Sequence, residues 1–309
     1  MTRRTRALGA LAAAVSLGLW YRRDTARAVA RLSRFEVRAV EAPSGRVEYC
    51  EWGLGRPSLL IHGVVGGWDG ASTWRRFVPP GYRIIAPARF GYLGSTMPEG
   101  ATPAMQADAL AALLDAVEVD EAPVLGFSAG STSAVQLALR HPHRVSRLVL
   151  LCANAPHPEP LTLPPRALAP YLFSQPVFWA ARTFARPALR RLAGFPARFP
   201  RDRRACDEEA EIMDSFSPVA LRTRGIIFDA CESNPDIASH PLERIAVPTL
   251  VVHARDDPLA SYDDARTMAE RIPGARFVAV PGGGHVFMHR DEAALAAVWE
   301  FLGREPDEP

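Results

Sequence analysis

The sequence predicts an α/β protein whose central sheet is mostly parallel, with helices on both faces and a helical insertion. Two observations support this prediction. Short apolar runs alternate with helical patterns along most of the chain, which is typical of a parallel sheet covered on both sides. The alternation stops between about residues 153 and 241, where proline, arginine and aromatic residues dominate. We therefore expect one core interrupted by a separate helical unit.

The expected strands are short apolar segments separated by helical patterns. They cover residues 58–61, 83–86, 123–126, 148–151, 249–252 and 277–280. An alternating pattern over residues 37–52, broken by Pro43, Ser44 and Gly45, predicts a hairpin before them. Helical patterns cover residues 103–117, 131–140, 261–272 and 291–302.

These patterns divide the chain into three parts. Residues 35–152 and 242–309 form the expected core, and residues 1–34 form an N-terminal segment. Residues 153–241, called the cap below, contain many aromatic side chains, which a loose linker would not carry. We therefore expect the cap to be a helical insertion packed over the sheet.

The N-terminal segment is basic and partly apolar. It holds eight arginines against one acid, Asp24, and residues 7–21 carry no charge. Arginines on both sides and the pair Trp20-Tyr21 at the far end fit an uncleaved membrane anchor, so we predict a membrane-associated protein. Two alternatives remain. One is a signal peptide and export, although no small-residue cleavage site follows; the other is an amphiphilic leader on a cytoplasmic protein.

Composition excludes several classes of function. All 36 basic residues are arginine, and the lack of lysine rules out Schiff-base catalysis, lysine-anchored pyridoxal phosphate and a Walker-type phosphate loop. Beyond residue 34 the chain holds 28 basic and 33 acidic residues, so we expect no nucleic-acid partner. The four cysteines are scattered without a Cys-x-x-Cys pair. We expect no metal and no organic cofactor.

The strongest chemical signal is the sequence Gly126-Phe127-Ser128-Ala129-Gly130. It follows an apolar strand and opens a helix, which is the placement that a nucleophilic serine needs. Small neighbours let the backbone bend there, and the helix N-terminus favours negative charge. We therefore predict Ser128 as a nucleophile.

A serine hydroxyl needs a base to remove its proton. His285, after the glycine run 282–284 and the last expected strand, is the best candidate. The competing histidines occupy weaker positions: His62 precedes a glycine turn, His253 ends a strand, and His289 lies near the last helix.

The base in turn needs a carboxylate to orient it, and Asp256 and Asp257 follow the strand at residues 249–252. We favour Asp257, with Asp256 as the alternative. The transition state also needs two backbone N–H groups for its oxyanion. We assign these to Ala129, directly after the nucleophile, and to Val64 in the glycine-rich turn at residues 62–67.

Four motifs in this order, LLIHGVVGG, VLGFSAG, TLVVHARDDP and PGGGH, resemble the α/β-hydrolase superfamily over about residues 45–303. The resemblance implies the α/β-hydrolase fold with a cap. It also implies a Ser–Asp–His order, with Ala254 at the glycine position of the family's HGxxD motif, which selects Asp257. The chain departs from the family at residues 88–95, where ARFGYLGS replaces the usual Asp-x-Arg-Gly-x-Gly-x-Ser. Val286 also replaces the tryptophan that often follows the histidine in carbon–carbon bond hydrolases.

These features predict a serine hydrolase that cleaves a carboxylic ester through an acyl-enzyme, without a cofactor. The aromatic cap predicts a small-molecule substrate with a hydrophobic group. One alternative is a carbon–carbon bond hydrolase of the same fold. Another is a ligand-binding protein that keeps the hydrolase scaffold without catalysis.

Overall fold

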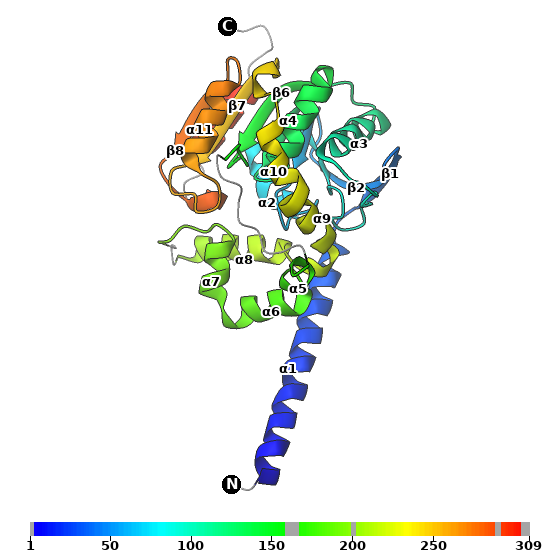
Figure 1. The fold of residues 1–309 in the computed structure, drawn as a ribbon, viewed down its shortest axis with the longest axis vertical. Coiled ribbons are helices and arrows are strands. Elements are labelled where there is room, and N and C mark those ends of the chain that lie inside the picture. Colours follow the sequence, from blue (N-terminus) through cyan, green and yellow to red (C-terminus); the bar gives the residue numbers. More distant parts are fainter. Residues whose placement is uncertain (1–2, 158–166, 199–201, 288–291, 304–309) are drawn as a thin grey trace.

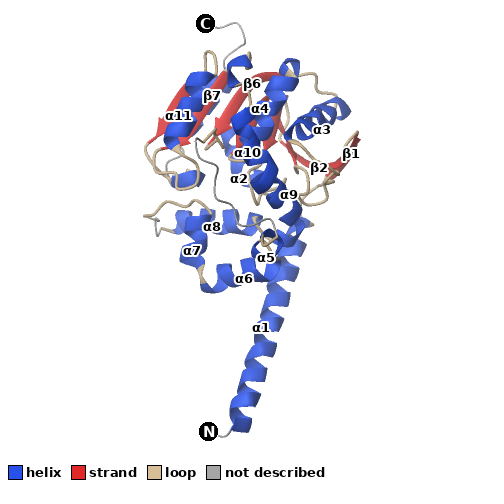
Figure 2. Cartoon of the chain, in the orientation of Figure 1, coloured by secondary structure: helices blue, strands red, loops and turns tan. Residues whose placement is uncertain are grey.

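The computed structural model describes residues 3–157, 167–198, 202–287 and 292–303, which contain one eight-stranded sheet (Figures 1 and 2). The strand order is β1-β2-β4-β3-β5-β6-β7-β8. The β1–β2 and β2–β4 pairs are antiparallel and the remaining pairs are parallel. The bounds are β1 Arg38–Ala42, β2 Gly45–Trp52, β3 Arg56–Ile61, β4 Tyr82–Pro87, β5 Ala122–Phe127, β6 Val145–Leu151, β7 Thr249–Ala254 and β8 Arg276–Val280.

Both faces of the sheet are apolar, which explains the continuous apolar runs of its inner strands. Leu59 and Ile61 of β3 join one buried cluster, while Leu60 between them joins the other. The first cluster is covered by α3 (Pro103–Ala116), α4 (Gly130–Arg140) and α11 (Tyr262–Arg271). The second is covered by α2 (Ala71–Trp74) and α12 (Glu292–Gly303). The predicted mostly parallel sheet with helices on both faces is confirmed.

The chain between β6 and β7 is helical in its described parts (Figure 2). Its helices are α5 (Ala169–Leu172), α6 (Gln175–Phe184), α7 (Arg186–Leu192), α8 (Arg203–Ser215), α9 (Thr223–Phe228) and α10 (Asn234–Asp236). Figure 1 shows α5 to α8 as a layer at one end of the sheet. The Pro164-Pro165 pair and Phe199 of this segment lie outside the described residues.

The N-terminal segment forms one long helix, α1 (Arg3–Leu32), that extends away from the core beside α5 and α6 (Figure 1). Its second half is attached to α6. The ring of Trp179 lies 5.5 Å from that of Trp20 and 5.4 Å from that of Tyr21, and its indole nitrogen donates to Asp24 at 3.2 Å. The large apolar side chains from Leu8 to Leu19 are exposed.

The prediction of a membrane-associated protein anchored through residues 7–21 is wrong. No helix in the described ranges combines the length and the apolar character that a membrane crossing requires. The physical reason is visible in the sequence: a spanning helix needs about 20 apolar residues, and this run is short, rich in alanine and bounded by Arg22 and Arg23.

A buried ion-pair cluster joins α1, the cap and the loop after β3. Asp69 accepts from Arg222 at 2.6 and 2.8 Å and from Arg31 of α1, and the Asp69 and Arg222 side chains are 0% exposed. Arg222 also donates to the carbonyl of Gly66 at 2.9 Å. Burial lowers the pKa of Arg222, and the adjacent Asp69 carboxylate offsets that effect. One carboxylate thus fixes three distant segments.

Replacement of Asp69 by asparagine will therefore destabilise the fold strongly. The variant leaves a buried guanidinium without its counter-charge, which costs about 3–5 kcal/mol of unfolding free energy. Asp108→Asn is the matched control, because its pair with Arg140 is exposed and contributes about 1 kcal/mol or less. Urea unfolding of both variants measures the difference. Equal losses would contradict the role given to Asp69.

Candidate active site

Ser128 lies on a strained turn between β5 and α4. Its φ is +50°, in the left-handed region that non-glycine residues rarely adopt. The Ser128 amide donates to the carbonyl of Leu151 at the end of β6, at 2.9 Å, and its carbonyl accepts from the Ser131 amide at 2.9 Å. The neighbouring strand and the new helix therefore hold the strained residue from both sides.

The two glycines of the motif permit this turn because larger residues would collide with backbone. A Cβ on Gly130 would lie 2.5 Å from the carbonyl oxygens of Ile61 and His62. A Cβ on Gly126 would lie 2.7 Å from the Cα of Ser131. Helix α4 can thus start directly against the end of β3.

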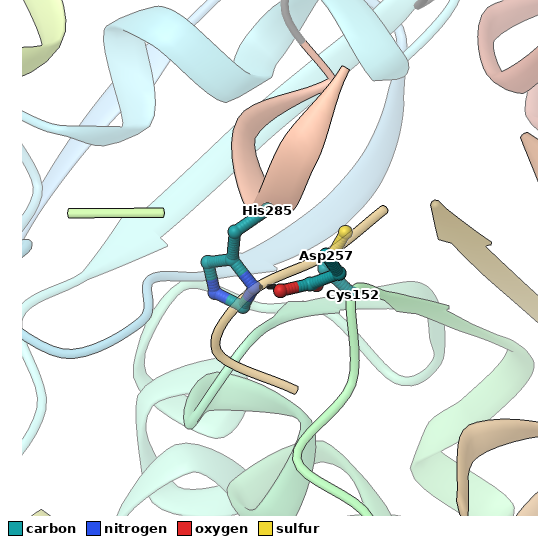
Figure 3. A group of neighbouring side chains, drawn as sticks. All are labelled: Cys152, Asp257 and His285. Atoms are coloured by element: carbon teal, nitrogen blue, oxygen red, sulfur yellow. Dashed lines mark hydrogen bonds and ion pairs between the residues drawn. The ribbon is translucent and has the colours of Figure 1, made fainter. Parts of the chain in front are cut away.

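His285 and Asp257 lie together at the ends of β8 and β7. The His285 Nδ1 atom lies 2.7 Å from Asp257 Oδ2, and both side chains are buried (Figure 3). Asp257 Oδ1 accepts the amides of Leu259 and Ala260 at 2.8 and 3.0 Å. Burial by itself would raise the pKa of this carboxyl. The charge interaction with His285 and the hydrogen bonds from His253, His285 and Ala260 outweigh burial, so the pKa lies well below its usual range. The carboxylate is therefore ionised and aimed at His285.

Asp256 has a different partner. Its two oxygens accept the amides of Gly284 at 2.8 Å and Gly283 at 3.3 Å, so it holds the glycine turn that precedes His285. Both aspartates thus act on the same loop. Only Asp257 reaches the imidazole.

The other histidines are placed differently. His62 donates from Nδ1 to the Gly63 carbonyl at 2.7 Å and accepts the Arg89 amide at Nε2 at 3.0 Å, so both of its nitrogens are used. Burial and the nearby Arg89 charge keep its pKa well below the usual value. His253 is buried behind Asp257. His289 lies outside the described residues.

The cap contacts His285 directly, which no sequence motif indicated. The Gly194 carbonyl, from the turn after α7, accepts the His285 amide at 2.8 Å. Gly194 has a φ of +80°, and a Cβ there would lie 2.4 Å from the His285 Cβ. A glycine is required at this contact, and the cap thereby helps to position the histidine loop.

Ser128, His285, Val64 and Ala129 all line one cavity of about 270 Å³. In the described part of the chain, the Val64 and Ala129 amides have no hydrogen-bond acceptor, so both can receive an oxyanion. The same part of the chain contains no hydrogen bond between Ser128 and His285. Such bonds are often long in the absence of substrate.

The cavity wall is mostly apolar, and the polar side chains among its described lining are neutral amides, hydroxyls and imidazoles, including Thr73, Asn154, Ser215 and Asn234. Core residues contribute Trp74 and Phe127, whose rings stack at 3.6 Å, and the cap contributes Ile212 and Phe216. Of the described residues that line the cavity, none is an arginine, an aspartate or a glutamate. The site therefore offers no counter-charge for an ionised substrate.

Cys152 completes the group drawn in Figure 3. Ligand atoms of Cys152, Asp257 and His285 all lie within 4.8 Å of one another, which is close enough for a metal ion. A metal would need the thiolate. Burial and the charge of Asp257 raise the pKa of the Cys152 thiol well above its usual value. We therefore interpret this group as a hydrogen-bonded pair of Asp257 and His285 beside a neutral thiol, and not as a metal centre.

The departure from the family pattern at residues 88–95 has a structural explanation. Arg89 forms a bidentate ion pair with Asp229 at 2.5 and 2.6 Å, and the Tyr92 hydroxyl donates to the same carboxylate. All three side chains are buried. This network ties the loop after β4 to the segment after α9, so the loop remains fixed without the usual aspartate and arginine.

The architecture and the grouped serine, histidine and aspartate define the class of protein as an α/β hydrolase. A family model described as alpha/beta hydrolase fold matches residues 59–291, so the chain belongs to this family and is a hydrolase.

Three proteins illustrate its relationships. The 2-hydroxymuconate semialdehyde hydrolase of Pseudomonas sp. (strain CF600) is 30% identical over 86% of this chain and 93% of its own length. The pimeloyl-[acyl-carrier protein] methyl ester esterase of Aromatoleum aromaticum is 29% identical over 78% of this chain and 97% of its own. A solved alpha/beta hydrolase fold protein from Nakamurella multipartita superposes with a TM-score of 0.68 at 27% identity, covering 86% of this chain and 99% of that one.

The two aspartates can be separated by matched substitutions. Asp257→Asn removes the charge that orients His285 and should lower kcat for an ester substrate by about 10³- to 10⁴-fold. Asp256→Asn keeps an oxygen that can accept the Gly284 amide, so we expect a loss of about tenfold or less. Steady-state kinetics on both variants checks this. A larger loss in Asp256→Asn would reverse the assignment.

Proposed function

We propose that this hydrolase is a serine esterase for small, uncharged carboxylic esters. The observation that carries the proposal is the cavity, in which Ser128, His285 and the two free amides share a mostly apolar wall whose described residues include no arginine, aspartate or glutamate. A substrate carboxylate buried there would have no cationic side chain to balance its charge, which lowers the affinity for such a substrate. A neutral acyl group does not incur the cost of burying an unpaired charge.

The proposed reaction has two halves. Ser128 Oγ attacks the ester carbonyl while His285 Nε2 takes the hydroxyl proton, and the Val64 and Ala129 amides stabilise the oxyanion. The tetrahedral intermediate collapses, and the alcohol leaves with the proton from His285. Water then attacks the acyl-enzyme and gives a proton to His285. The second tetrahedral intermediate collapses, which releases the acid and returns the proton from His285 to Ser128. Asp257 holds the imidazole through Nδ1–H and stabilises its charged form.

The second candidate is hydrolysis of a carbon–carbon bond in a vinylogous diketone. The 30% sequence identity with a 2-hydroxymuconate semialdehyde hydrolase favours this candidate. The absence of a charged residue among the described lining of the cavity, and Val286 after His285, favour the ester. A third candidate, a non-catalytic binding protein, predicts that Ser128 does not react with electrophiles.

A fluorophosphonate probe tests the nucleophile. We expect rapid labelling of the wild-type protein, because the probe forms a covalent bond with an activated serine, and no labelling of Ser128→Ala. Fluorescence after denaturing electrophoresis measures it. A wild-type protein that resists the probe would support the binding-protein candidate.

A pair of esters of equal size tests the uncharged pocket. We expect p-nitrophenyl pentanoate to be cleaved at least about tenfold better, in kcat/KM, than the corresponding hemiglutarate, whose acyl chain ends in a carboxylate. The cavity is also small for a ligand site, so butyrate should exceed dodecanoate. Efficient cleavage of an aryl ring-cleavage diketone, with poor turnover of every ester, would instead establish the carbon–carbon candidate.

A further inference from the structure

His253 is a buried imidazole that the proposed reaction does not use. It is the fifth residue of β7, is 0% exposed, and does not line the cavity. Its Nε2 atom lies 3.0 Å from the Ala260 carbonyl and 3.3 Å from Asp257 Oδ2. Its Nδ1 atom has no partner in the described part of the chain.

These contacts determine where the proton of His253 lies. A carbonyl oxygen can only accept a hydrogen bond, and so can an ionised carboxylate. Because both neighbours of Nε2 are acceptors, Nε2 must carry a proton. The N–H group therefore points its positive end at Ala260 and Asp257 together.

His253 supports both oxygens of the Asp257 carboxylate. Its Nε2 atom lies 3.3 Å from Asp257 Oδ2, the same oxygen that contacts His285. It also holds the Ala260 peptide by its carbonyl, and the amide of that residue donates to Oδ1 at 3.0 Å. A single side chain thus fixes the orientation of the carboxylate through two routes.

On the basis of the proposed roles of Ser128, His285 and Asp257, we infer that His253 is a positioning residue. It orients the Asp257 carboxylate and, together with His285, stabilises the negative charge of that carboxylate. The other side chains packed around this arrangement do not supply an equivalent contact. The Cys152 thiol also hydrogen-bonds Asp257, but it is neutral and a weak donor. The Tyr262 ring lies 6.4 Å from that of His253, and Arg255 lies over Tyr262.

Matched substitutions test the inference in the full-length protein. His253→Leu removes the donor and should lower kcat for p-nitrophenyl butyrate about tenfold with little change in KM, because Asp257 does not contact substrate. The acid limb of kcat/KM against pH should move upward by about half a unit, because Asp257 then shares its charge with His285 alone. His253→Gln, whose amide nitrogen can replace Nε2, should recover most of the activity. Thermal unfolding verifies that each variant is folded.

Three results would overturn the inference. The first is a folded leucine variant with wild-type kcat and pH profile, and the second is a glutamine variant as impaired as the leucine variant. The third comes from ¹⁵N NMR of the wild-type protein, which needs no variant: an Nε2 without a proton would contradict the required tautomer. Failure of the proposed function looks different, because then the wild-type protein itself would hydrolyse no ester.

Discussion

The backbone of Ser128 is the constraint on which the site depends. A φ of +50° is costly for serine, and it persists because the Ser128 amide is held by β6, its carbonyl by α4, and its flanking glycines by close contact with backbone. Since β5 lies between β3 and β6, the carboxyl ends of the parallel strands deliver the loops after β3, β7 and β8 to the same edge. The Val64 amide comes from the loop after β3, the Asp257 carboxylate from the loop after β7 and the His285 imidazole from the loop after β8, and the Ala129 amide belongs to the Ser128 turn itself.

Local patterns were sufficient to predict the sheet, its covering helices and the strand-to-helix turn at Ser128. Each apolar run and each glycine turn acts within a few residues, so its consequence is visible in the sequence. The choice between Asp256 and Asp257 depends on contacts with residues that are distant in the sequence. Neighbouring side chains on one loop point in different directions, and only the structure shows that Asp256 reaches the Gly283 and Gly284 amides while Asp257 reaches His285.

Other features join residues that are distant in sequence and carry no motif. Asp69 and Arg222 are 153 positions apart, yet together they fix the loop after β3 against the cap. The Gly194–His285 contact links the cap to the histidine loop, and His253 lies behind Asp257 without lining the cavity. The anchor prediction failed for another reason. Residues 7–21 are apolar in composition, but their length and their flanking arginines do not meet the requirement of a membrane crossing.

The central claim is that Ser128 carries the acyl group during turnover, and trapping that intermediate tests it most directly. The protein would be mixed with p-nitrophenyl butyrate, quenched with acid within the first turnover, digested, and analysed by mass spectrometry. The account predicts a butyryl group on the peptide that contains Ser128, and none in Ser128→Ala. Hydrolysis of the ester with the acyl group on another residue, or with no acylated peptide under conditions that trap it in a control serine esterase, would contradict the account.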